Sequence, residues 1–162
     1  MKKFNALSLA RQAMIAAIYA ALTLLLYPIS FGSAQCRVSE ALTVLPYFSP
    51  LCTLGLAVGC FCSNIIGGFG ILDGVLGTLA TAISGVLTSK IKNKYLAPLP
   101  PVIVNALIIP IVIVFATSPD NFLPVYLINV LQIGLGQLLS CYLLGLPLMG
   151  LIRKHGLERF LK

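Results

Sequence analysis

The sequence is short of charge, and above all of acidic residues. Only 9% of its 162 residues are charged, whereas about a quarter of the residues in an ordinary soluble domain are charged. The four acids are Glu40, Asp73, Asp120 and Glu158, too few to solvate the surface of a globule. No long polar loop is present that would hold a separate soluble domain. The composition therefore excludes a water-soluble protein.

Residues that carry out chemistry are equally scarce. The one histidine, His155, lies in a basic tail, and the acids and cysteines do not have the spacing of a metal site. Because His155 is the one histidine and lies in the basic tail, a Ser/His/Asp triad is also excluded. The glycine-rich stretches lack the Gly-Lys-Ser/Thr of a P-loop. The five cysteines are an odd number, which argues against a disulfide framework. We expect no enzymatic activity, metal or cofactor in this chain.

Long uncharged apolar runs dominate what is present. The chain is 59% hydrophobic and its mean hydropathy is +1.01. A helix of about 20 apolar residues crosses the roughly 30 Å of a bilayer core, and runs such as LIIPIVIVFA do not alternate as barrel strands do. The first run also resembles a signal peptide, but we interpret it as a retained helix. These features predict an all-α integral membrane protein, with residues 1–162 forming a single transmembrane domain.

The basic residues predict the topology. Short cytoplasmic loops collect lysine and arginine, so each pair of neighbouring basic clusters must be separated by an even number of crossings. Because this rule explains the net charge of +7, no nucleic-acid partner is expected. We predict six helices, at about 9–29, 37–48, 50–66, 71–89, 97–116 and 123–151, with both termini in the cytoplasm. The clusters are Lys2, Lys3 and Arg11; Lys90, Lys92 and Lys94; and Arg153, Lys154, Arg159 and Lys162.

The remaining polar residues predict a binding site. Charged and amide side chains are costly in lipid and usually face a bundle interior or a cavity. Seven of them fall near the outer ends of the predicted helices, while Asn105 and Gln137 lie deeper. We interpret the set as a small-molecule pocket open to the outside; an alternative is an interfacial Arg37–Glu40 ion pair with the amides joining helices. The set is Gln35, Arg37, Glu40, Asn64, Asp73, Asn129 and Gln132, with Phe31 or Tyr126 available to stack on a ring.

The first predicted helix has a regular pattern of small residues. Ala13, Ala17 and Ala21 repeat every four residues and so share one face, with Ala16 and Ala20 on the adjoining face. Small residues at this spacing let a second helix approach closely in a membrane. We therefore expect the face of Ala13, Ala17 and Ala21 to bind a partner helix.

Three blocks resemble a known family. FGSAQCRVSEALTVLPYFSP, GLAVGCFCSN and LDGVLGTLATAISG are similar to the signature blocks of the QueT family, whose members are substrate-binding (S) components of energy-coupling-factor (ECF) transporters for queuosine precursors. The resemblance implies a prokaryotic, multi-pass cell-membrane protein with an outward-facing pocket. It also implies a transmembrane coupling subunit against the alanine-rich helix, two cytoplasmic ATPases that hydrolyse ATP, and a bundle that topples to carry its pocket inward.

A queuosine precursor carries a 7-deazaguanine base, whose chemistry suits the polar set. The N–H groups on one edge of the ring can be accepted by a carboxylate such as Glu40 or Asp73, and its carbonyl can be read by Arg37 or an amide. An aminomethyl precursor adds a cation for the second carboxylate. Two alternatives stay open, namely another vitamin-like substrate and a membrane scaffold subunit without a ligand.

Overall fold

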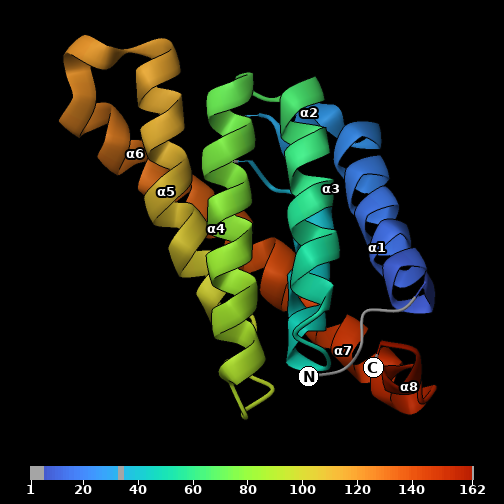
Figure 1. Ribbon diagram of the computed structural model, residues 1–162. Coiled ribbons are helices and arrows are strands. Elements are labelled where there is room, and N and C mark those ends of the chain that lie inside the picture. The colour runs from blue at the N-terminus through green and yellow to red at the C-terminus, as the bar shows by residue number, and fades with distance from the viewer. Residues whose placement is uncertain (1–5, 33–34, 162) are drawn as a thin grey trace.

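Five long helices stand side by side in the protein. The computed structural model describes residues 6–32 and 35–161, and these contain helices but no strand. Lys2, Lys3 and Lys162 of the terminal basic clusters lie outside the described residues. Each long helix packs on the next, and the row is visible in Figure 1. In order along the row they are α1 (Ala6–Leu25), α3 (Cys52–Gly67), α4 (Ile71–Lys90), α5 (Leu99–Thr117) and α6 (Phe122–Leu138).

A ten-residue 3-10 helix, η1 (Val38–Tyr47), occupies the inside of the bundle. It packs against α1, α3 and α4 and against the C-terminal part of the chain, and seven of its ten residues are buried. At about 2 Å per residue it is roughly 20 Å long, shorter than a bilayer core. The helix predicted over 37–48 is therefore present, but as an internal 3-10 segment.

The last apolar run bends through a π-helical segment. α6 continues through η3 (Leu139–Leu144) into α7 (Gly145–Lys154), and the helical stretch from the short η2 (Pro119–Asn121) to Lys154 is 36 residues long. The π segment brings Ser140 to within 3.3 Å of the sulfur of Cys36. This bend accounts for the excess length of the single tilted span predicted over 123–151.

The first helix ends earlier than predicted. α1 ends at Leu25, and a separate single turn, α2 (Tyr27–Ser30), follows it. Pro28 lacks the N–H that would bond to the preceding turn, and its ring clashes with that turn. One continuous helix over 9–29 is therefore wrong at its C-terminal end. A short α8 (Glu158–Leu161) near the C-terminus was not anticipated.

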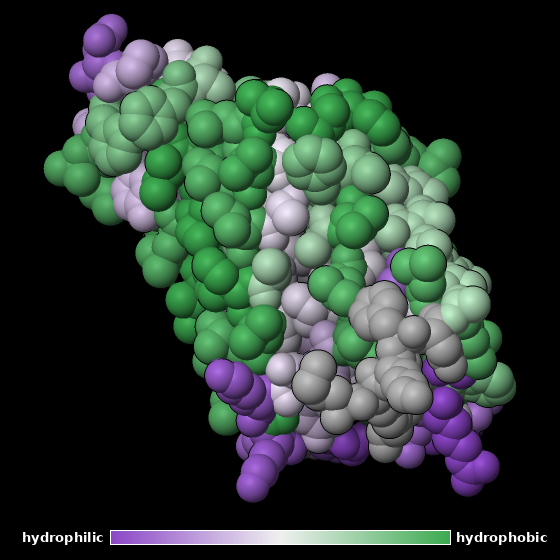
Figure 2. Space-filling model, viewed as in Figure 1, coloured by the Kyte–Doolittle hydropathy of each residue, from purple (hydrophilic) through white to green (hydrophobic). Residues whose placement is uncertain are grey.

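The surface is that of a multi-pass membrane protein. Three single helices, α1, α4 and α5, and the continuous stretch from η2 to α7 are long and apolar enough to cross a bilayer, and α3 is a shorter apolar helix. Figure 2 shows a broad apolar surface with hydrophilic groups gathered at the lower end and at the opposite corner. Helices that satisfy their own backbone hydrogen bonds are what such a surface requires in lipid.

Two glycines let α1 and α3 approach closely. A Cβ atom added to Gly55 would lie 2.7 Å from the carbonyl oxygen of Gln12, and one added to Gly59 would lie 2.7 Å from that of Ala16. Because the obstructing atoms belong to the backbone, a larger residue would push the helices apart. This small-residue contact fixes α1 against the rest of the bundle, with one face inward and the other exposed.

Candidate functional site

Arg37 is the centre of a buried polar cluster. It precedes η1, and only 2% of its surface is exposed. Its Nη1 donates to Asn64 Oδ1 at 2.9 Å, its Nη2 to Gln35 Oε1 at 3.2 Å and its Nε to the Ser30 carbonyl at 3.3 Å. Three separate segments of the chain therefore hold one guanidinium group in a fixed plane, as is typical of arginines that recognise planar groups.

Asp73, in the first turn of α4, lies next to this guanidinium. Its Oδ2 is 3.9 Å from Arg37 Nη2, and its residue is fully buried. Neither carboxylate oxygen accepts a hydrogen bond of ordinary geometry from any described residue, although the backbone N–H of Phe69 lies close enough to stabilise the carboxylate. Buried carboxylates normally have such partners, so Asp73 retains acceptor capacity inside the bundle.

Glu40 lies deeper and is fully engaged. Tyr19 Oη donates to Glu40 Oε1 at 2.5 Å, and Asn105 Nδ2 donates to Glu40 Oε2 at 3.3 Å. These bonds tie η1 to α1 and α5. The proposed Arg37–Glu40 ion pair is wrong, because among the described residues Arg37 pairs with Asp73 instead.

The backbone near Arg37 is unusual. Gln35 has a φ of 41°, in the left-handed region that residues other than glycine rarely adopt. Outliers of this kind persist only where the surroundings hold them, and they gather at ligand sites. The aromatic ring of Phe31 lies 4.9 Å from the Arg37 Cζ, which places this predicted stacking residue on the cluster.

The predicted residues of α6 do not join the cluster. Asn129 donates to the Val125 carbonyl of its own helix at 2.8 Å. Tyr126 donates to the Leu107 carbonyl at 3.1 Å and stacks on Phe122, and Gln132 is half-buried on the same helix. The structure thus brings together Gln35, Arg37, Glu40, Asn64, Asp73 and Phe31, but not Asn129, Gln132 and Tyr126.

Sequence reasoning missed Tyr19 and gave Asn105 no role. Tyr19 is fully buried on the inner face of α1, one turn before Thr23, whose hydroxyl lies 2.6 Å from that of Ser39. A buried tyrosine hydroxyl usually has a hydrogen-bond partner. The signal available in the sequence was the four-residue spacing of Tyr19 and Thr23, on a different face from the alanines.

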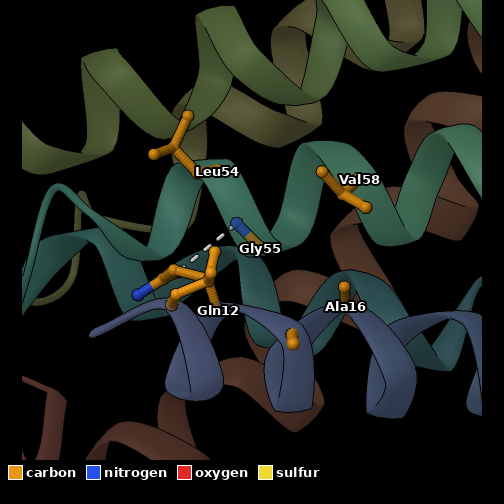
Figure 3. Close-up of a pocket in the computed structure, with 7 residues that line it drawn as sticks. Gln12, Ala16, Leu54, Gly55 and Val58 are labelled. Carbon is orange, nitrogen blue, oxygen red and sulfur yellow. Dashed lines mark hydrogen bonds between the residues drawn. The ribbon is translucent and has the colours of Figure 1, made fainter. Parts of the chain in front are cut away.

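The alanine face of α1 is exposed. Ala13, Ala17 and Ala21 all point away from the bundle. An apolar groove of about 340 Å³ runs between α1 and α3 beside Ala13, and Gln12 Oε1 accepts the Gly55 N–H at 3.3 Å in its floor. Figure 3 shows this groove, which is lined by Leu9, Gln12, Ala13, Ala16, Leu54, Gly55 and Val58.

The fold and the enclosed charged cluster define a multi-pass membrane protein with a polar site among its helices. The family model described as "QueT transporter" matches residues 9–154, so the chain belongs to the QueT transporter family. "Queuosine precursor transporter QueT" of Lactococcus lactis subsp. cremoris (strain MG1363) is 34% identical over 85 residues, which are 51% of this chain and 50% of that protein. The match thus spans about half the length of this curated relative. No solved structure matches the chain.

Proposed function

We propose that this chain is the substrate-binding component of an ECF-type importer and that it takes up a queuosine precursor from outside the cell. Membership in a transporter family supports transport, and the printed name of the Lactococcus relative supports the substrate. The sequence has no P-loop, so in this proposal the energy comes from partner proteins. Two partner ATPases hydrolyse the ATP.

The buried Asp73–Arg37 pair is the observation that supports a ligand most directly. The pair joins an acceptor that no described residue satisfies to a cation held by three other groups. A 7-deazaguanine ring presents N–H donors on one edge and a carbonyl oxygen beside them. Asp73 would accept from that edge, and the remaining N–H groups of Arg37 and the amide of Gln35 would read the carbonyl. Asn64 holds Arg37 in place, because its own N–H groups donate to the Asp73 carbonyl and the Cys60 sulfur.

Ligand-dependent stabilisation tests this function. The purified chain should melt at a higher temperature with 7-deazaguanine precursors than with common vitamins. A ligand at 100 times its dissociation constant stabilises a protein by about 2.7 kcal/mol. If an unrelated vitamin stabilised the chain instead, that vitamin and not a queuosine precursor would be the substrate. If no compound stabilised it, the ligand-free scaffold would be favoured.

The exposed alanine face is proposed to bind the transmembrane coupling subunit. We expect Ala17→Trp to abolish complex assembly and uptake, because a large ring prevents close helix contact. Ligand binding to the isolated chain should be unchanged. The matched control is Ala116→Trp, at an exposed alanine of α5. Normal assembly of the Ala17→Trp variant would contradict the assignment.

Six crossings with both termini in the cytoplasm are proposed for the membrane topology. Lys90 is the last residue of α4, Lys92 and Lys94 follow it, and Asp120 lies just beyond the C-terminal end of α5. In a variant without the native cysteines, a membrane-impermeant thiol reagent added outside should label Asp120→Cys and not Lys92→Cys. External labelling of Lys92→Cys would overturn the topology.

A further inference from the structure

A small cleft lies at the basic end of the bundle, far from the Arg37 cluster. Its volume is about 100 Å³, and it lies between the turn after α4 and the helix α7. Hydrophilic groups gather at this end of the molecule (Figure 2). The cleft is lined by Lys94, Tyr95, Leu146, Met149, Gly150 and Arg153.

Arg153 is held in place on one wall. Its Nη2 donates to Tyr47 Oη at 2.9 Å, and its Cζ lies 5.5 Å from the ring centre of Tyr47 and 5.9 Å from that of Phe48. Tyr47 in turn donates to the Lys92 carbonyl at 3.0 Å. The guanidinium is therefore oriented by η1 and the 92–95 turn, and among the described residues it donates to no acceptor other than Tyr47.

Lys94 supplies a second cation to the lining of the cleft. Its Nζ lies 4.7 Å from the ring centre of Tyr95, which is 59% exposed. Neither Lys94 nor Arg153 forms an ion pair with a carboxylate of the described residues. The ion pair among those residues is Arg37–Asp73, which lies outside the cleft. Two cations thus face one cleft without an anion to balance them.

We propose that this cleft binds the phosphate of an anionic phospholipid. Basic pockets between membrane helices at the cytoplasmic surface suit anionic headgroups, and an exposed tyrosine is typical of the membrane interface. Leu146 and Met149 give the cleft an apolar wall beside the cations, where the glycerol and acyl portion of a lipid fits better than a free phosphate ion. This site is independent of the proposed substrate, and its placement at the cytoplasmic surface rests on the proposed topology.

Titration of phosphatidylglycerol into the detergent-solubilised chain, followed by native mass spectrometry, tests the proposal. Lys94→Gln and Arg153→Gln should each weaken retention of the lipid about fivefold, because each removes a cation that lines the cleft and would contact the phosphate directly. The matched controls Lys92→Gln and Lys154→Gln remove the same charge from neighbouring positions outside the cleft and should change retention less than twofold. Lys94→Gln is the cleaner variant, because the Lys94 side chain donates no hydrogen bond to a described residue.

Three results would overturn the site. Equal weakening in all four variants would show that the positive surface attracts lipid without a defined cleft. Equal retention of phosphatidylcholine and phosphatidylglycerol would show that the negative charge is not recognised. Competition by inorganic phosphate at the concentrations at which the lipid binds would show that a free phosphate, and not a lipid, is the ligand.

Discussion

Asp73→Asn is expected to weaken binding of a 7-deazaguanine precursor by about tenfold to a hundredfold. The carboxylate of Asp73 is buried and accepts no hydrogen bond of ordinary geometry from a described residue, so its acceptors are free for the N–H edge of the base. Hydrogen bonds to a charged group contribute about 1.5–3 kcal/mol each, and about 1.4 kcal/mol corresponds to a factor of ten. Asparagine keeps the shape but loses the charge and one acceptor.

The measurement is the dissociation constant of the monodisperse variant, determined by calorimetry in detergent. We expect the variant to fold, because Arg37 keeps its bonds to Asn64, Gln35 and Ser30. Asp120→Asn, which changes an exposed acid, is the matched control and should bind normally. Glu40→Gln is also expected to lower stability, because Glu40 accepts from Tyr19 and Asn105, and to weaken binding by about tenfold through η1, which follows Arg37 directly. Wild-type affinity in both carboxylate variants would make the cluster purely structural.

Arg37→Met is expected to lower the free energy of unfolding by about 3–5 kcal/mol, the cost of removing one partner of a buried ion pair. Asp73 would then remain buried without its cation, and the acceptors on Gln35 and Asn64 would lose their donor. The melting temperature in detergent measures the loss. Arg159→Met, at an exposed arginine of α8, should have little effect.

The double variant Arg37→Met/Asp73→Asn separates the charge from the packing. Because it removes both charges, it should be more stable than Arg37→Met alone. If the loss of unfolding free energy in the double variant equalled the sum of the losses in the two single variants, the two residues would not interact energetically. The 3.9 Å ion pair would then contribute nothing.

Much of the architecture was predictable from the sequence. Apolar runs placed α3, α4 and α5 within two residues of their observed bounds, because length and hydrophobicity decide where a membrane helix lies. The helix type within 38–47 and the π segment at 139–144 were not predictable. Both depend on packing between segments distant in sequence, such as Cys36 against Ser140.

The buried polar cluster was also predictable in part. Arg37, Asn64 and Asp73 were identified because polar groups in an apolar chain are conspicuous. Assigning partners needed the tertiary structure, since Arg37 and Glu40 are close in sequence and yet bond to different residues. Asn129 and Gln132 resembled site residues by type alone, and their helix lies elsewhere in the bundle.

The bond from Tyr19 to Glu40 joins the buried cluster to the helix that carries the exposed alanines. In the proposed site, a ligand held by Arg37 and Asp73 that shifts η1 would alter the bond from Tyr19 to Glu40, and with it the packing of α1. Thermodynamic linkage then makes the effect reciprocal. A ligand that changes the affinity of α1 for a docking helix by some factor must have its own affinity changed by the same factor when that helix docks.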